Sequence, residues 1–242
     1  MRRIAWRQVA IAGLALLLLV TLARTAYTGR RAALVAAEWG GRGRWLNGTT
    51  IVVDPGHGGD DPGAVVGDTK EKKLVLEISQ ALESTLEEQG AKVILTRDED
   101  KSLGGRLREE LGKRVAKADE HDAQVYVSIH ANKDNCVCWG AQSFYQRKGN
   151  PAGKELAVAI QNQLRLQTPT TRVALPANFF VLRKATVPAA MVEVGFLTNA
   201  RERAMLQDRA YQRTLATAIA MGVADFFKSQ VPETDLKGYI GQ

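Results

Sequence analysis

Residues 50–96 read TIVVDPGHGGDDPGAVVGDTKEKKLVLEISQALESTLEEQGAKVILT, and this stretch decides the fold class. It opens with a β-branched apolar run that Pro55 and Gly56 end, which is typical of a buried strand leading into a loop. Across 71–88, apolar residues recur at every fourth position, as on one face of an amphipathic helix. A second apolar run follows at 91–96. This order predicts a βαβ unit with two parallel strands and a right-handed crossover.

The chain beyond this unit continues to alternate strands and helices. Further strands are expected over 124–129, 141–145, 179–182 and 189–194, and further helices over 106–118, 153–166, 201–207 and 209–227. Six strands interleaved with helices predict an α/β fold with an open, mostly parallel six-stranded sheet, flanked by helices on both faces. The length of 242 residues suits one such domain with short additions.

The positive charge of the chain is confined to its beginning. The formal net charge is +7, and residues 1–45 carry eight arginines and one acid, so the remainder is formally neutral. A neutral folded part lacks the basic surface that a nucleic-acid-binding domain needs. Nucleic acid is therefore not an expected partner.

The N-terminal segment has the pattern of an export signal. Arginines precede an uncharged apolar run over 8–23, which predicts either an uncleaved signal anchor or a cleaved signal peptide, a buried core helix being the weaker alternative. With either a signal anchor or a signal peptide, the chain crosses a membrane, and this segment would contact that membrane. The expected layout is a signal or anchor helix at 1–26, a stalk at 27–49, a catalytic domain at 50–228 and a tail at 229–242.

Four side chains stand where an α/β fold places its ligands. His57 and His130 each follow a predicted strand, Glu71 opens the first helix, and Glu193 ends a buried apolar run. Each has an ordinary explanation: a structural histidine, a carboxylate at a helix start, or half of a buried ion pair. Together they match a catalytic zinc site, in which two imidazoles and one carboxylate hold the ion and a second carboxylate takes a proton from water. Spacing alone leaves open which glutamate is the ligand, and no His-Glu-x-x-His helix is present.

Several motifs in fixed order resemble one family. They are Asp54-Pro55-Gly56-His57-Gly58-Gly59 with Asp61-Pro62-Gly63-Ala64, Glu71-Lys72, Thr96-Arg97-Asp98, Ser128-Ile129-His130-Ala131-Asn132 and Val192-Glu193-Val194-Gly195-Phe196-Leu197-Thr198-Asn199. This set resembles the zinc-dependent N-acetylmuramoyl-L-alanine amidases with the amidase_3 catalytic domain. The short layout and Gly140-Ala141-Gln142-Ser143-Phe144-Tyr145 are most similar to the germination-specific, spore-cortex members of endospore formers.

The resemblance implies one Zn²⁺ per chain, bound by His57, Glu71 and His130, with Glu193 as the catalytic general base. It implies hydrolysis of the amide between N-acetylmuramic acid and L-alanine of the stem peptide in peptidoglycan, and in the germination subfamily a role in forming muramic-δ-lactam in the cortex. The enzyme is then extracytoplasmic, anchored or secreted, for example in the intermembrane space of the developing spore. A protein activator at the membrane or in the spore envelope is a further expected partner.

Two other functions remain open on the sequence. One is a catalytically inactive, membrane-tethered peptidoglycan-binding protein, which the intact set of two histidines and two glutamates disfavours. The other is a general amidase of the vegetative or septal wall. A phosphate-binding enzyme is disfavoured, because the glycine-rich loop has neither a G-x-G-x-x-G pattern nor a Walker lysine.

Other polar residues near strand ends are weaker candidates. Substrate contacts are weighed against ordinary surface or turn roles for four residues: Arg97, Asn132, Arg183 and Asn199. His121, flanked by acids, is expected to be solvated. Cys136 and Cys138 are spaced tightly for an internal disulfide and are expected to be incidental thiols, the alternatives being metal binding or pairing between chains.

Overall fold

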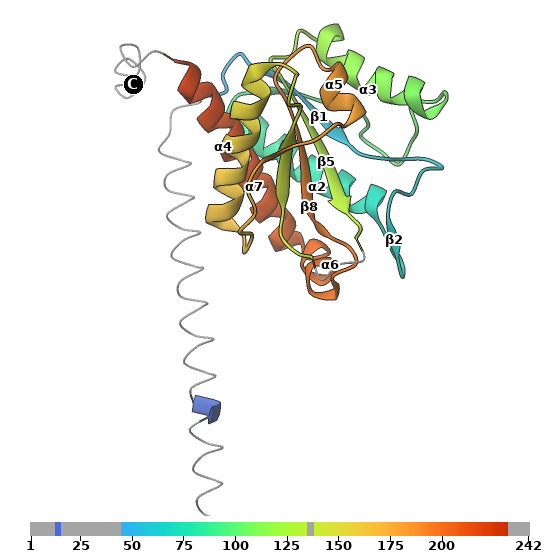
Figure 1. The fold of residues 1–242 in the computed structure, drawn as a ribbon, viewed down its shortest axis with the longest axis vertical. Helices are drawn as coiled ribbons and strands as arrows, with labels where there is room; N and C mark the ends of the chain where they lie inside the picture. Colours follow the sequence, from blue (N-terminus) through green and yellow to red (C-terminus); the bar gives the residue numbers. More distant parts are fainter. Residues whose placement is uncertain (1–12, 16–44, 135–137, 232–242) are drawn as a thin grey trace, which may run out of the picture. The chain divides into compact units, whose positions relative to one another are not determined.

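A computed structural model describes residues 13–15, 45–134 and 138–231. The described residues 45–134 and 138–231 belong to one compact unit, and residues 13–15 belong to a separate one. The compact unit contains a six-stranded sheet with strand order β4-β1-β5-β8-β6-β7 (Figure 1). Its strands are β1 (Thr50–Pro55), β4 (Lys92–Leu95), β5 (Val125–Asn132), β6 (Gln142–Tyr145), β7 (Leu175–Pro176) and β8 (Ala189–Phe196). All neighbouring strands run parallel except β6 and β8, which confirms the predicted open, mostly parallel sheet.

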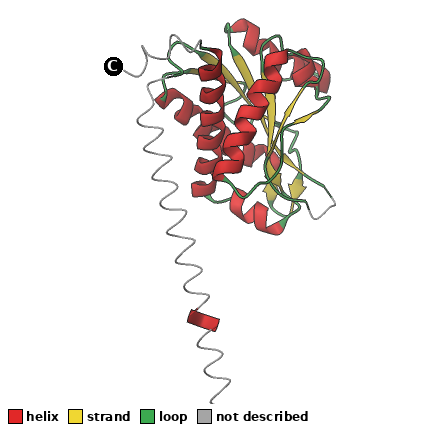
Figure 2. Cartoon of the chain, turned by 60° about the vertical axis from the view of Figure 1, so that its left-hand side comes forward, coloured by secondary structure: helices red, strands yellow, loops and turns green. Residues whose placement is uncertain are grey.

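Helices cover both faces of this sheet (Figures 1 and 2). On one face, α2 (Glu71–Glu88) packs on the first strands and α4 (Pro151–Gln167) on β6 and β8, while α7 (Arg209–Gln230) packs against both helices. On the other face, α3 (Leu107–Glu120) and α5 (Phe180–Lys184) pack against each other and against the central strands. The inner strand β1 is therefore buried on both sides, which explains its unbroken apolar run.

The predicted strand at 179–182 is wrong. This segment lies in α5, where the amide of Arg183 donates to the carbonyl of Phe179 and that of Ala185 to Val181. A short apolar run fits a strand and a buried helical turn equally well, and tertiary packing against α3 decides between them here. The sixth strand is instead β7, whose Pro176 is tolerated because β7 is the edge of the sheet.

A small hairpin was not predicted. Strands β2 (Val65–Val66) and β3 (Thr69–Lys70) pair antiparallel just before α2. Gly67 turns the chain with a φ of 57°, a left-handed conformation that suits glycine. The hairpin ends where Glu71 begins α2, so it fixes the entry of the chain into the first helix.

The predicted N-terminal segment lies largely outside the described residues. The same is true of most of the stalk and of the tail beyond residue 231. Within residues 13–15, 45–134 and 138–231, no helix has the length and apolar character needed to cross a membrane. One short helix completes the described fold, α6 (Ala200–Leu206), which lies between β8 and α7.

Close packing of α4 on α7 predicts a sharp difference between two helical glycines. A Cβ at Gly222 in α7 would lie 2.3 Å from the Cα of Ile160, whereas a Cβ at Gly112 in α3 meets nothing within 4 Å. We expect Gly222→Ala to lower the free energy of unfolding by about 1–3 kcal/mol through overpacking. Gly112→Ala, the matched control, should raise it by about 0.5–1 kcal/mol because alanine restricts the unfolded chain. Urea unfolding of both variants measures the difference, and equal effects would contradict this packing.

Candidate metal centre and active site

Two histidines and a glutamate converge at the carboxyl edge of the sheet. His57 follows β1, Glu71 is the first residue of α2, and His130 lies in β5. Glu71 Oε1 lies 3.2 Å from His57 Nε2 and 3.0 Å from His130 Nδ1, and ligand atoms of all three residues lie within 4.8 Å of one another. The structure thus brings together three residues that are far apart in the sequence.

The Glu71 carboxylate is held on both of its oxygens. The amide of Ala131 donates to Oε1 at 2.9 Å, and the amide of Ala64 donates to Oε2 at 2.8 Å. Burial raises the pKa of Glu71, but hydrogen bonds and charge from His130 and His57 outweigh it and hold the pKa well below its usual range. Glu71 is therefore an ionised, fixed carboxylate at 4% exposure.

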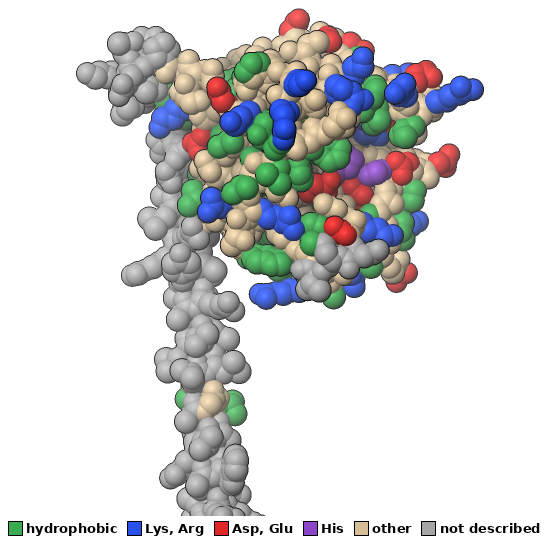
Figure 3. Space-filling view, viewed as in Figure 1, with side chains coloured by type: hydrophobic (Ala, Val, Ile, Leu, Met, Phe, Trp, Pro, Cys, Tyr) green, Lys and Arg blue, Asp and Glu red, His purple; other side chains and the backbone are tan. Residues whose placement is uncertain are grey.

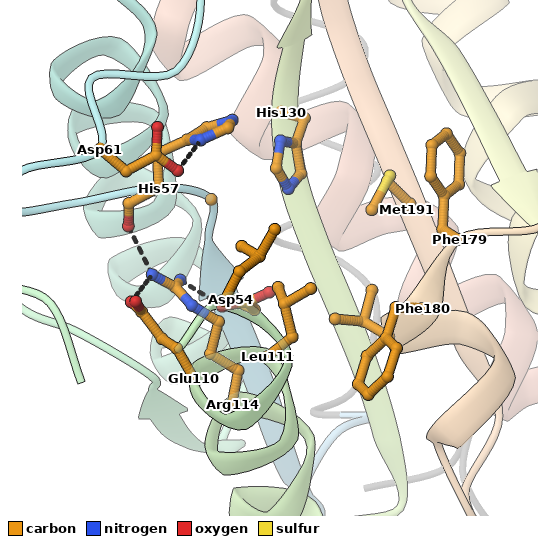
Figure 4. Close-up of a pocket in the computed structure, with 13 residues that line it drawn as sticks. Asp54, His57, Asp61, Glu110, Leu111, Arg114, His130, Phe179, Phe180 and Met191 are labelled. Atoms are coloured by element: carbon orange, nitrogen blue, oxygen red, sulfur yellow. Dashed lines mark hydrogen bonds and ion pairs between the residues drawn. The ribbon is translucent and has the colours of Figure 1, made fainter. Parts of the chain in front are cut away.

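Asp61 orients the other side of the His57 ring. Its Oδ2 lies 2.6 Å from His57 Nδ1 (Figure 4). Nε2 of the same ring faces Glu71. Burial lowers the pKa of His57, but the hydrogen bonds and charges of Glu71 and Asp61 raise it to about 9. A carboxylate behind a histidine is the usual support of a metal-ligating imidazole, because it fixes the ring and its tautomer. Sequence reasoning missed this role, for which the four-residue spacing from His57 was the available signal.

Two glycines next to the three side chains have no space for a side chain of their own. A Cβ at Gly56 would lie 2.3 Å from Cε1 of His130, and a Cβ at Gly63 would lie 2.6 Å from both Glu71 Oε2 and His57 Cδ2. Two imidazole nitrogens and one carboxylate that converge on a point form a donor set suited to Zn²⁺ with an open fourth position. The residues present therefore fit a catalytic metal ion.

Glu193 stands directly beside this group. It lies in β8 in register with His130 of β5, so both face the same side of the sheet. Its Oε2 is buried and has no hydrogen-bond partner among the described residues. Burial raises the pKa of Glu193, the positive charge of His130 lowers it, and repulsion from Glu71 raises it further. The result is a pKa of about 7. A carboxylate of this kind can accept a proton and release it again near neutral pH.

A cavity of about 230 Å³ opens beside the two histidines. Its far wall is apolar and is made by α3, α5 and the start of β8, with five side chains: Leu107, Leu111, Phe179, Phe180 and Met191 (Figure 4). Histidine side chains are visible at the surface with acidic side chains on either side (Figure 3). The side chains of His57 and His130 are 23% and 20% exposed, so a solute can reach them.

Three of the weaker candidates make contacts within the protein. Arg97 is 1% exposed and donates to main-chain carbonyls, so it offers no surface to a substrate. Asn199 caps α6 by accepting from the amides of Arg201 and Glu202. Arg183 donates to Asn178 at the surface. These contacts give ordinary structural roles to three of the residues that the sequence left open.

The expectation of an incidental thiol is wrong for Cys138. The structure places Cys138 in a disulfide bond, and its carbonyl accepts a hydrogen bond from Asn199. Cys136 lies outside the described residues. The tight spacing of the two cysteines was therefore a poor guide to the state of Cys138.

The contact between His57 and Asp61 predicts an effect on metal affinity. We expect Asp61→Asn to weaken zinc binding by about 10–100-fold, because the imidazole loses its fixed carboxylate partner. Competition with a chromophoric chelator measures this affinity. Asp60→Asn, at the neighbouring exposed position, is the control and should bind zinc like the unmodified protein. Equal affinities of all three proteins would contradict the role of Asp61.

Comparison with known proteins identifies the family. The model of the N-acetylmuramoyl-L-alanine amidase family Amidase_3 matches residues 51–225. The germination-specific N-acetylmuramoyl-L-alanine amidase of Bacillus subtilis is 37% identical over 78% of this chain and 84% of its own length. LytC, an N-acetylmuramoyl-L-alanine amidase of the same organism, is 33% identical over 75% of this chain and 36% of its own length. The CwlD amidase of Clostridioides difficile, solved in complex with the GerS lipoprotein, superposes with a TM-score of 0.69 at 33% identity, over 75% of this chain and 99% of its own. This chain belongs to the N-acetylmuramoyl-L-alanine amidase family.

Proposed function

We propose that this chain cleaves peptidoglycan with one zinc ion held by His57, Glu71 and His130, and with Glu193 as the general base. The reaction is hydrolysis of the amide between N-acetylmuramic acid and L-alanine of the stem peptide, the activity of its family. The observation that carries the proposal is the convergence of two imidazoles and one carboxylate beside a second, unpartnered carboxylate.

Each residue has a defined task in this reaction. A zinc ion, when bound, supplies positive charge that acidifies water and polarises the scissile carbonyl. Glu193 is placed to take the proton of the attacking water, since its Oε2 is buried and makes no hydrogen bond within the described part of the chain. The same carboxyl group then returns the proton to the nitrogen of the leaving alanine. Asp61 holds the His57 ring in place throughout.

The cavity between α3 and α5 supplies a surface for the substrate. Its apolar wall faces the two histidines, so a group seated there lies next to the metal centre. The atoms on either side of the scissile amide carry methyl groups, the lactyl methyl of muramic acid and the methyl of L-alanine. Apolar side chains around the cavity are suited to such groups because burying them removes apolar surface from water.

Glu193 and His130 are expected to separate chemistry from metal binding. Glu193→Gln should keep zinc and lower turnover by about 10²–10⁴-fold, because the amide cannot take a proton from water. His130→Ala should lose both zinc and turnover, because it removes a ligand. Mass spectrometry of stem peptides released from peptidoglycan measures turnover, and metal analysis measures zinc. Glu88→Gln, an exposed glutamate at the end of α2, is the control. A Glu193→Gln protein with full turnover would refute the assignment.

Phe180 is expected to affect substrate binding without affecting the metal. Phe180→Ala removes part of the apolar cavity wall, so KM should rise several-fold with little change in kcat. Steady-state kinetics on soluble muropeptides measures both constants. Val173→Ala, at a side chain that is 53% exposed and does not line the cavity, is the control. An unchanged KM would place the substrate elsewhere.

We further propose spore cortex as the biological substrate, with muramic-δ-lactam formation as the outcome. The support is the 37% identity to the germination-specific amidase of Bacillus subtilis and the structural likeness to CwlD. The full chain should release stem peptides from cortex peptidoglycan faster than from vegetative sacculi. A preference for vegetative sacculi would favour a general wall amidase, to which the likeness to LytC points. Zinc binding without release from either material would favour the inactive, peptidoglycan-binding alternative.

The proposed place of action is outside the cytoplasm. Residues 1–26 would direct the chain there as an anchor or signal peptide, with residues 27–49 as a stalk, 50–228 as the catalytic domain and 229–242 as a tail. The relative CwlD was solved with the GerS lipoprotein, which supports a protein partner for this chain as well. Activity measured with and without a co-expressed envelope lipoprotein tests that part of the proposal.

A further inference from the structure

Two buried arginines hold the loop that carries His57. The carbonyls of Pro55, the last residue of β1, and of Gly56 and His57, the next two residues, each accept a hydrogen bond from a guanidinium group. Arg97 donates to Pro55 at 3.0 Å through Nε and to Gly56 at 2.7 Å through Nη2. Arg114 donates to Pro55 at 2.7 Å through Nη1 and to His57 through Nη2 (Figure 4). Both arginines are buried, with 1–2% of their surface exposed.

A buried carboxylate balances the charge of Arg114. Asp54 Oδ1 accepts from Arg114 at 2.9 Å and from Thr96 at 2.6 Å, while Oδ2 accepts from Tyr126 at 2.6 Å and Ser128 at 2.8 Å. Burial raises the pKa of Asp54, but the charge of Arg114 and these hydrogen bonds lower it below its usual value. Asp54 therefore stays ionised, and Arg114 is fixed between it and the loop.

The second arginine ties the same loop to the helix of Glu71. Arg97 Nη2 also donates to the carbonyl of Lys72, at 2.8 Å. The side chain of Lys72 in turn donates to the carbonyl of Gly59 at 2.6 Å and pairs with Asp100 at 2.7 Å. The segment before His57 and the first turn of α2 are thus held to one guanidinium group.

The backbone of His57 explains why this support matters. His57 has a φ of 60°, a left-handed conformation that non-glycine residues adopt only when their surroundings impose it. This conformation accompanies the approach of Nε2 to Glu71 while the His57 carbonyl accepts from Arg114. The hydrogen bond from Arg114 to the His57 carbonyl is therefore a contact that holds the backbone of the residue in this conformation.

We propose that Arg97 and Arg114 are positioning residues that hold His57 in its metal-ligating conformation by binding the carbonyls of residues 55–57. Arg97 does not line the cavity, and Arg114, which does, is only 2% exposed; both are proposed to act through the backbone of His57. The inference rests on the proposed function, because it takes His57 to be a zinc ligand. It explains why two cations are buried beneath a site that itself binds a cation.

The test replaces each guanidinium with a single ammonium group. Arg114→Lys keeps a positive charge near Asp54, but one ammonium cannot replace the two guanidinium nitrogens that contact Asp54 and the His57 carbonyl. Arg97→Lys likewise cannot reach Pro55, Gly56 and Lys72 together. We expect each variant of the full chain to bind zinc about 10–100-fold more weakly by chelator competition, as for other outer partners of metal ligands. Cobalt-substituted protein should show an altered visible absorption spectrum, since the ligand geometry changes.

Two control variants separate positioning from general stability. Arg172→Lys alters an arginine that also donates to a main-chain carbonyl, that of Trp139, and makes no contact with the metal-site residues. Thr96→Val removes a hydrogen bond to Asp54 without touching the loop carbonyls. Both should bind zinc like the unmodified protein, although Thr96→Val should lower the melting temperature of the zinc-free protein. His57→Ala should bind zinc more weakly than the unmodified protein.

The outcomes distinguish the inference from the proposed function. Weak zinc binding by both lysine variants, with melting temperatures no lower than that of Thr96→Val, supports the positioning role. The inference fails if both variants bind zinc normally, if zinc affinity follows melting temperature across all variants, or if neither variant folds. If only one folds, its zinc affinity decides. If the unmodified protein and His57→Ala bind zinc equally, the proposed metal site itself is wrong.

Discussion

The site depends on the carboxylate of Glu71. This group faces both imidazoles and accepts amide hydrogen bonds from Ala64 and Ala131, so it joins the glycine-rich loop, α2 and β5. An ionised carboxylate at 4% exposure is unfavourable unless donors surround it. The donors come from two segments outside α2, the glycine-rich loop and β5, which means that the charge is tolerated only once the domain has folded. Ligand geometry and folding are therefore linked through one residue.

Much of the fold and the site could be predicted because the signals are local. The βαβ unit at 50–96 is indicated by the spacing of its apolar residues and by the proline and glycine residues that end its elements. Helix α2 begins and ends at the expected residues. The parallel sheet then brings strand ends to one edge, which is why His57 and His130 could be paired without coordinates. The choice of Glu71 as ligand and Glu193 as base rests on resemblance and stays a prediction; the structure places Glu71 in one group with the two histidines and leaves Glu193 Oε2 without a hydrogen-bond partner among the described residues.

What could not be predicted depends on contacts between distant segments. The run 179–182 forms a helical turn because α3 packs against it, and no residue within the run shows this. Arginine is usually a surface residue, so the sequence does not indicate that Arg97 and Arg114 are buried. Only their burial and their hydrogen bonds in the folded domain show that they hold the His57 loop. The strand β7 has two residues, too few for any period to appear.

Gly56 shows how one part of the site limits another. Its φ lies outside the left-handed range, so the backbone alone would accept other residues. The space for a side chain is filled by the imidazole of His130, which arrives from a different strand. A glycine is therefore required at position 56 because His130 occupies the space that a side chain would need. If this loop were transferred to another α/β scaffold, the neighbouring strand would have to supply a side chain of the size of histidine opposite the glycine. A shorter residue there would leave a void, and a larger one would clash with the loop.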